Sequence, residues 1–127
     1  MNIYIKLMVL ILSLSGCTSA PIIEIEHVPI RMNKPDYTLD DVERGIIRAG
    51  IGLGWEMFKK KPGVIEGYLQ KQYHIIIVDI TYTMTEYNII YKDSKNMDYS
   101  SGNIHNAYNR WTEDLNKGIG QVLAGIY

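Results

Sequence analysis

The sequence predicts a two-layer α+β domain, with an N-terminal and a C-terminal helix packed on one face of a four-stranded antiparallel meander. Apolar residues recur at helical spacing between positions 42 and 53 and again between 104 and 126. Between them, β-branched residues are dense from 74 to 84, which is typical of a strand. Short turn sequences separate the strand-like segments, as expected for antiparallel neighbours.

The first helix is predicted to begin after Thr38. Thr38 can act as the N-cap, and an acidic residue follows three positions later. Apolar residues then fall at spacings of four, three and four on one helix face: Val42, Ile46, Ala49 and Leu53. Three glycines at 50, 52 and 54 predict that the helix stops near Gly54.

Four strands are predicted after this helix, over residues 55–61, 64–70, 74–84 and 87–92. Pro62-Gly63 forms the first turn, and Thr85-Glu86 makes the tight connection into the last strand. The third strand should present one strongly apolar face, made of Ile76, Val78, Ile80, Tyr82 and Met84. Residues 93–103 are expected to form a polar loop.

The last helix carries the strongest periodic pattern. Asn103 is the expected N-cap, and the apolar stripe contains Ile104, Tyr108, Trp111, Leu115, Ile119, Val122 and Ile126. We expect Trp111 and Leu115 to be buried against the sheet.

The N-terminus has the pattern of a secretory signal, with Lys6 before a short apolar run at 7–12 and small residues leading to the only cysteine. Leu14-Ser15-Gly16-Cys17 resembles the lipobox of bacterial lipoproteins. The resemblance implies that Cys17 is acylated and becomes the mature N-terminus, anchored to the membrane through its acyl chains. Thr18, which is not acidic, favours the outer membrane and its periplasmic face. A plain secretory signal with a chance cysteine is the alternative.

This reading divides the chain into a signal peptide at 1–16, an acylated tether at 17–35 and a single α+β domain at 36–127. Ile23, Ile25 and His27 alternate with glutamates, so a short edge strand docked on the domain is an open alternative to a free tether. No apolar run reaches the roughly 18–20 residues that span a bilayer.

Composition excludes several classes of function. Lys and Arg number 13 against 14 Asp and Glu, so no basic excess indicates nucleic-acid binding. With Cys17 acylated, the domain has no thiol for a disulfide or a metal ligand. The lysine run Lys59–Lys61 could attract an anionic partner, or could protect an edge strand from aggregation.

Motifs for catalysis and cofactor binding are incomplete. The glycines at 50–54 follow a helix and do not precede one, which argues against a phosphate loop. Residues 93–98 place Lys95 and Met97 where a calcium loop needs oxygen ligands. The three histidines lack metal-ligand spacing. We therefore expect no enzymatic activity, no catalytic residue, no metal and no cofactor, and we expect His105 to be a structural residue in the first turn of the last helix.

A tyrosine-rich region could form a groove for a sugar or a peptide, with Tyr91, Tyr99, His105 and Asn109 as candidate binding residues. The alternative is that most tyrosines pack beneath the last helix. We expect a non-enzymatic, lipid-anchored lipoprotein that binds another envelope component; a small-ligand binder is the alternative.

Three stretches are similar to a family of small, largely uncharacterised lipoproteins of Gram-negative bacteria. They are His74 to Tyr82, Tyr87-x-Ile89-x-Tyr91-x-x-Ser94-x-Asn96, and Ile104-His105-x-x-Tyr108-Asn109-x-Trp111. The similarity covers roughly residues 40–115, and its last stretch is the most specific. It implies the lipobox and the α+β outline, and no activity.

Overall fold

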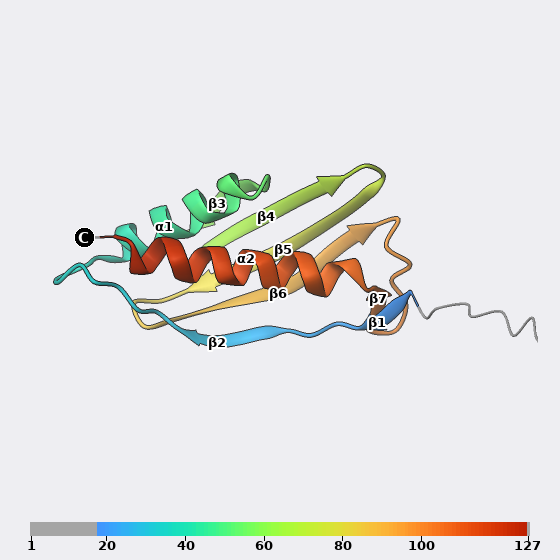
Figure 1. Cartoon of the computed structure of the whole chain (residues 1–127), viewed down its shortest axis with the longest axis horizontal. Coiled ribbons are helices and arrows are strands. Elements are labelled where there is room, and N and C mark those ends of the chain that lie inside the picture. The colour runs from blue at the N-terminus through green and yellow to red at the C-terminus, as the bar shows by residue number, and fades with distance from the viewer. Residues whose placement is uncertain (1–17, 127) are drawn as a thin grey trace, which may run out of the picture.

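The computed structural model describes residues 18–126, so the predicted signal peptide and Cys17 lie outside the described residues. Two helices and seven strands are present within that range (Figure 1). In chain order they are β1 (Ser19–Pro21), β2 (Ile25–Pro29), α1 (Leu39–Gly52), β3 (Glu56–Lys61), β4 (Val64–Lys71), β5 (His74–Tyr82), β6 (Glu86–Lys95), β7 (Asn103–His105) and α2 (Ala107–Ala124).

The main sheet has five antiparallel strands in the order β2-β6-β5-β4-β3, and β1 pairs with β7 in a separate two-stranded sheet. The predicted α+β class with two helices is confirmed. The four predicted strands are present as the antiparallel meander β3-β4-β5-β6. The sheet differs from the prediction by a fifth strand, because β2 joins the meander at its β6 edge, where Ile25 pairs with Ile89 and Val28 with Tyr87. The segment expected as a tether therefore contains two strands.

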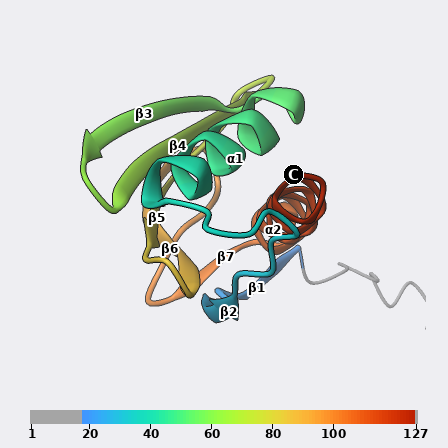
Figure 2. The same cartoon turned by 90° about the vertical axis from the view of Figure 1, so that its left-hand side faces the viewer.

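Both helices lie on the inner side of the curved sheet (Figure 2). The core forms where the inward residues of the strands meet the two helices. Its fully buried members include Val42 and Ile46 from α1, Ile76, Val78 and Ile80 from β5, and Leu115 and Ile119 from α2. Burial of this apolar surface is the main term that stabilises the fold.

Helix α1 begins at the predicted place for the predicted reason. The Thr38 hydroxyl accepts the Asp41 N–H, and the Asp41 carboxylate accepts the Thr38 N–H at 2.9 Å, which completes a capping box. The helix ends at Gly52, and Gly54 turns the chain with φ of +88°. Because Leu53 lies past the helix, its side chain is exposed and not in the core.

Helix α2 begins at Ala107, so the prediction of Asn103 as its N-cap is wrong. Residues 103–105 instead form β7, with Ser19 paired with His105 and Ala20 with Ile104. Ile104 is fully buried in this strand. The spacing of four between Ile104 and Tyr108 imitated a helix, because a residue in the strand and a residue in the helix both point into the same core.

The buried face of α2 is rotated relative to the prediction. Its buried residues are Ala107, Tyr108, Thr112, Leu115, Ile119 and Leu123. Leu115 is buried as predicted, but Trp111 is only half-buried at the edge of the core, so that part of the prediction is wrong. Thr112 occupies the core because its hydroxyl donates to the Tyr108 carbonyl at 3.0 Å and leaves no unpaired polar group.

Candidate functional site

The described residues leave the outer face of the main sheet without a second layer. In Figure 2, both described helices lie on the opposite, inner side. Side chains alternate between the two faces of a strand, so the residues that stand between the buried inward residues in the sequence form this outer face. Its apolar members are Phe58 on β3, Val64 and Tyr68 on β4, Ile75 and Ile77 on β5, and Ile90 on β6.

Strand register places these residues in rows across the sheet. Phe58 is paired with Glu66, Glu66 with Asp79, and Asp79 with Ile90, so an apolar residue stands at each end of a row with two acids in its middle. In the next row Tyr68 is paired with Ile77. Phe58 is 46% exposed, a large fraction for a phenylalanine. We call these six apolar side chains, with the charged groups among them, the outer face.

A small ion network lies in the middle of the outer face. The Lys92 ammonium is 2.7 Å from a Glu66 carboxylate oxygen and 3.6 Å from Asp79, and Lys60 approaches Glu66 at 3.9 Å. The hydrogen bond from Lys92 lowers the pKa of Glu66 and raises the pKa of Lys92 itself. Both groups therefore keep their charges around neutral pH, and the face carries fixed charges between apolar side chains.

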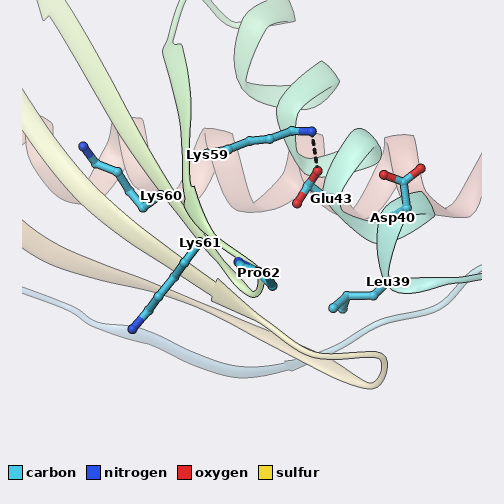
Figure 3. Close-up of a pocket in the computed structure, with 7 residues that line it drawn as sticks. All are labelled: Leu39, Asp40, Glu43, Lys59, Lys60, Lys61 and Pro62. Carbon is cyan, nitrogen blue, oxygen red and sulfur yellow. Dashed lines mark ion pairs between the residues drawn. The ribbon is translucent and has the colours of Figure 1, made fainter.

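A hollow with a volume of about 320 Å³ lies between the start of α1 and the β3–β4 turn (Figure 3). Its lining is Leu39, Asp40, Glu43, Lys59, Lys60, Lys61 and Pro62. Glu43 already bonds Lys59 at 2.7 Å and accepts the Tyr82 hydroxyl at 2.6 Å. Because its acids and lysines nearly balance, the hollow presents no strong field for an anion. β3 is an edge strand, in agreement with a protective role for these lysines.

The predicted binding residues Tyr91 and Tyr99 do come together. Their rings stack with centroids 4.7 Å apart, and Tyr91 also meets the buried Tyr108 edge-on at 5.7 Å. The Tyr91 hydroxyl lies 2.9 Å from the Ser94 hydroxyl. Tyr91 is half-buried in this cluster, and Tyr99 is the member whose ring is exposed.

Asn109 and His105 point elsewhere. The Asn109 amide donates to the Pro21 carbonyl at 2.9 Å and accepts the Ile23 N–H at 3.0 Å, so both ends of this side chain fasten the N-terminal segment. His105 lies in β7 and not in a helical turn, which corrects the predicted placement. Its backbone N–H donates to the Met97 carbonyl at 2.7 Å, and its ring accepts the Ala107 N–H at 3.1 Å. These contacts hold the preceding loop against α2.

Three other residues of the tyrosine-rich region are packed in the core: Tyr82, Tyr87 and Tyr108. Tyr87 donates to Asn116 of α2, and burial raises its pKa to about 12. Burial and the bond to Glu43 likewise raise the pKa of Tyr82 to about 12. Burial also raises the pKa of Tyr108. Of the cavities at the core edge, one of about 70 Å³ beside Trp111 and one of about 140 Å³ beside Arg44, neither is lined by a tyrosine.

Sequence reasoning overlooked the outer face, although a signal was present. Ile75 and Ile77 alternate with the inward apolar residues of one strand, and Ile90 does so in the next, so isoleucine occurs on both faces of these strands. This pattern is typical of strands that are covered on both faces. Between residues 18 and 126, no three His, Cys, Asp or Glu side chains are grouped so that they could hold a metal ion, and no helix is long and apolar enough to cross a membrane.

Comparison with family models, with curated proteins and with solved structures finds no match to this chain.

Proposed function

We propose that this protein is a lipid-anchored, non-enzymatic module on the periplasmic face of a bacterial outer membrane, and that it binds another envelope protein through the outer face of its sheet. The anchor rests on the lipobox pattern that ends at Cys17. The binding function rests on one observation: the outer face carries the exposed Phe58 among half-buried apolar side chains, and no element of the described residues covers it.

The chemistry of the outer face suits a protein partner. Phe58, Ile77 and Ile90 offer apolar area without a deep cavity, as protein interfaces usually do. The network of Glu66, Lys92 and Asp79 supplies fixed charges of both signs, which give a partner register and specificity more than affinity. A small ligand would need a concave site, and the tyrosines proposed for one are largely packed among core residues.

The binding function is tested by placing a photo-cross-linking phenylalanine analogue at Phe58 in living cells. A matched probe at Lys117, exposed on α2, is the control. We expect a discrete protein adduct from position 58 and none of the same mass from position 117. Ile90→Glu, which puts a charge at the other end of the same row, should abolish the adduct without lowering the amount of protein.

An adduct that forms equally from both positions, or that survives Ile90→Glu, would contradict binding through the outer face. The anchor has its own test: Cys17→Ser should move the protein from the membrane fraction to the supernatant. A variant that still sediments with membranes after washing would contradict acylation at Cys17.

A further inference from the structure

The anchor position and the fold together restrict how the domain can stand on a membrane. Thr18 accepts the Asn106 N–H on its carbonyl at 2.7 Å, and Ser19 is already paired with His105. Two extended residues span at most about 7 Å, so an acyl group on Cys17 would be attached within that distance of an ordered strand. A tether this short keeps the end of the domain that carries Thr18 close to the bilayer.

That end can be identified in the fold. In Figure 1 the described chain begins beside the loop that follows β6. The β4–β5 turn lies at this same end of the molecule, and the C-terminus lies at the opposite end. Contacts link these parts: the rings of His74 and His105 are 5.2 Å apart, and the Asn96 amide donates to the Tyr73 carbonyl at 2.7 Å. We call the β4–β5 turn at 71–74 and the loop at 96–102 the anchor end.

Two exposed tyrosines mark the anchor end. Tyr73 is 82% exposed, and Tyr99 is 49% exposed with its ring stacked on Tyr91. Tyrosine combines an apolar ring with a polar hydroxyl, and it is enriched where proteins meet the headgroup layer of a membrane. The loop that carries Tyr99 is fixed by Met97, which is 1% exposed, and by the bond from His105 to the Met97 carbonyl.

Charge plays a small part at this end. Lys71 is the last residue of β4, Lys95 is the last residue of β6, and Asp98 lies in the loop that follows β6. Two lysines against one aspartate leave only a slight positive excess. Attachment there should depend on tyrosine insertion more than on anionic lipid, because surface charges are strongly screened at physiological salt.

We propose that the anchor end lies on the membrane, with Tyr73 and Tyr99 in the lipid headgroup layer, so that the strands run away from the bilayer and the outer face stands sideways, open to a partner. This inference rests on the proposed acylation of Cys17. Tyr73 and Tyr99 thus contact the phospholipid headgroups of the same membrane that holds the acyl chains of Cys17.

The test uses the full acylated protein in vesicles of phosphatidylethanolamine and phosphatidylglycerol. Cys17 is the only cysteine and is consumed by acylation, so Gln72→Cys gives one site for a spin label in the turn beside Tyr73. Lys61→Cys gives the control site: Lys61 ends β3 and lines the hollow beside the start of α1 (Figure 3), which lies at the opposite end of the molecule from β1 (Figure 1). Accessibility to a water-soluble nickel collider and to oxygen is then measured at each label.

We expect several-fold lower nickel accessibility and higher oxygen accessibility at position 72 than at position 61. Replacing both tyrosines, Tyr73→Ser with Tyr99→Ser, should raise nickel accessibility at position 72 toward the control value while the protein still floats with the vesicles. Equal accessibility at 72 and 61 in protein that floats would overturn this orientation and leave the anchor intact. Protein that does not float would overturn the anchor and this inference together.

Discussion

At the scale of single residues, Asp41 is the most constrained charge in the described chain. Its side chain is 2% exposed, and it accepts the Thr38 N–H while pairing with Lys34 at 3.0 Å and with Arg44 at 2.6 Å. These partners outweigh the cost of burial and hold the pKa of the Asp41 carboxyl well below its usual range, with the Thr38 N–H the largest cause. The carboxylate thus joins the start of α1 to the segment before it.

The depressed pKa predicts how stability changes with pH. A carboxyl whose pKa is lower in the folded state stabilises the fold above its unfolded pKa, and this contribution is lost as the pH falls toward the folded value. We expect the melting temperature to drop between about pH 5 and pH 2 and to drop less steeply in Asp41→Asn, which should already be less stable at neutral pH.

Asp40→Asn is the matched control, because Asp40 is 66% exposed and its ion pair is with the exposed Arg44 in the i, i+4 position. It should melt close to the wild type at every pH. Thermal melts that fall in parallel for the wild type and Asp41→Asn would show that Asp41 does not carry the acid sensitivity.

At the scale of elements, α1 and α2 approach each other at Gly45. A methyl group there would overlap the side chain of Leu123 and lie 3.2 Å from Ile126. Leu123 is buried and cannot move aside without disturbing the core. Gly45→Ala should therefore lower the free energy of unfolding by about 1–3 kcal/mol, as overpacked cores do.

Gly52→Ala provides the control in the same helix. Apart from the adjacent residues and the helix's own backbone, no atom lies within 4 Å of a methyl group at that position, so alanine should be neutral or should stabilise the helix by up to about 1 kcal/mol. Urea unfolding of the two variants measures the difference. If Gly45→Ala is as stable as Gly52→Ala, the close packing of the helices is not limiting.

The N-terminal segment gives a second test at this scale. Asn109→Ala removes two hydrogen bonds, to Pro21 and Ile23, each worth about 1 kcal/mol or roughly fivefold in local opening. Hydrogen exchange over residues 19–23 should accelerate by at least that factor while core amides keep their rates.

Asn106→Ala should leave exchange in the N-terminal segment unchanged, since the Asn106 side chain makes no capping bond. Unchanged exchange in Asn109→Ala would instead free Asn109 for the binding role that the sequence suggested.

Some elements could be predicted from the sequence and others could not. The start of α1 and the turn at Pro62-Gly63 were predictable, because local chemistry alone determines them. β7 was not, because a three-residue strand exists only through its pairing with β1, some eighty residues earlier. Likewise, the alternation at Ile23–His27 is compatible with a strand. Ile25 lies in one because it pairs with Ile89 at the edge of β6, which the local sequence does not show.

The candidate site was less predictable than the fold. Tyr91 and Tyr99, two of the four candidate binding residues, stack on each other, whereas the other two candidates, Asn109 and His105, fasten the chain to itself. Which face of a sheet stays open depends on where both helices dock. Strand periodicity alone cannot give that, because both faces of β5 carry isoleucine.

At the scale of the whole molecule, the proposal joins three features: an anchor at one end, a rigid domain and an open sheet face along its side. The strands run along the length of the molecule between the anchor end and the end that holds the C-terminus (Figure 1). A partner could thus reach the outer face without competing with the membrane for the same surface. Truncating the outer face should affect partner binding and leave membrane attachment unchanged.

Hydroxyl-radical footprinting of Phe58 is the most direct test of whether a partner protein covers the outer face. It compares native membranes with the purified protein in lipid vesicles. Ile51, which is 60% exposed near the end of α1, reports on general access to the radical. If a partner covers the outer face, we expect Phe58 to be oxidised in vesicles and several-fold protected in native membranes, while Ile51 reacts equally in both. Equal oxidation of Phe58 in the two preparations would contradict binding of a partner at the outer face.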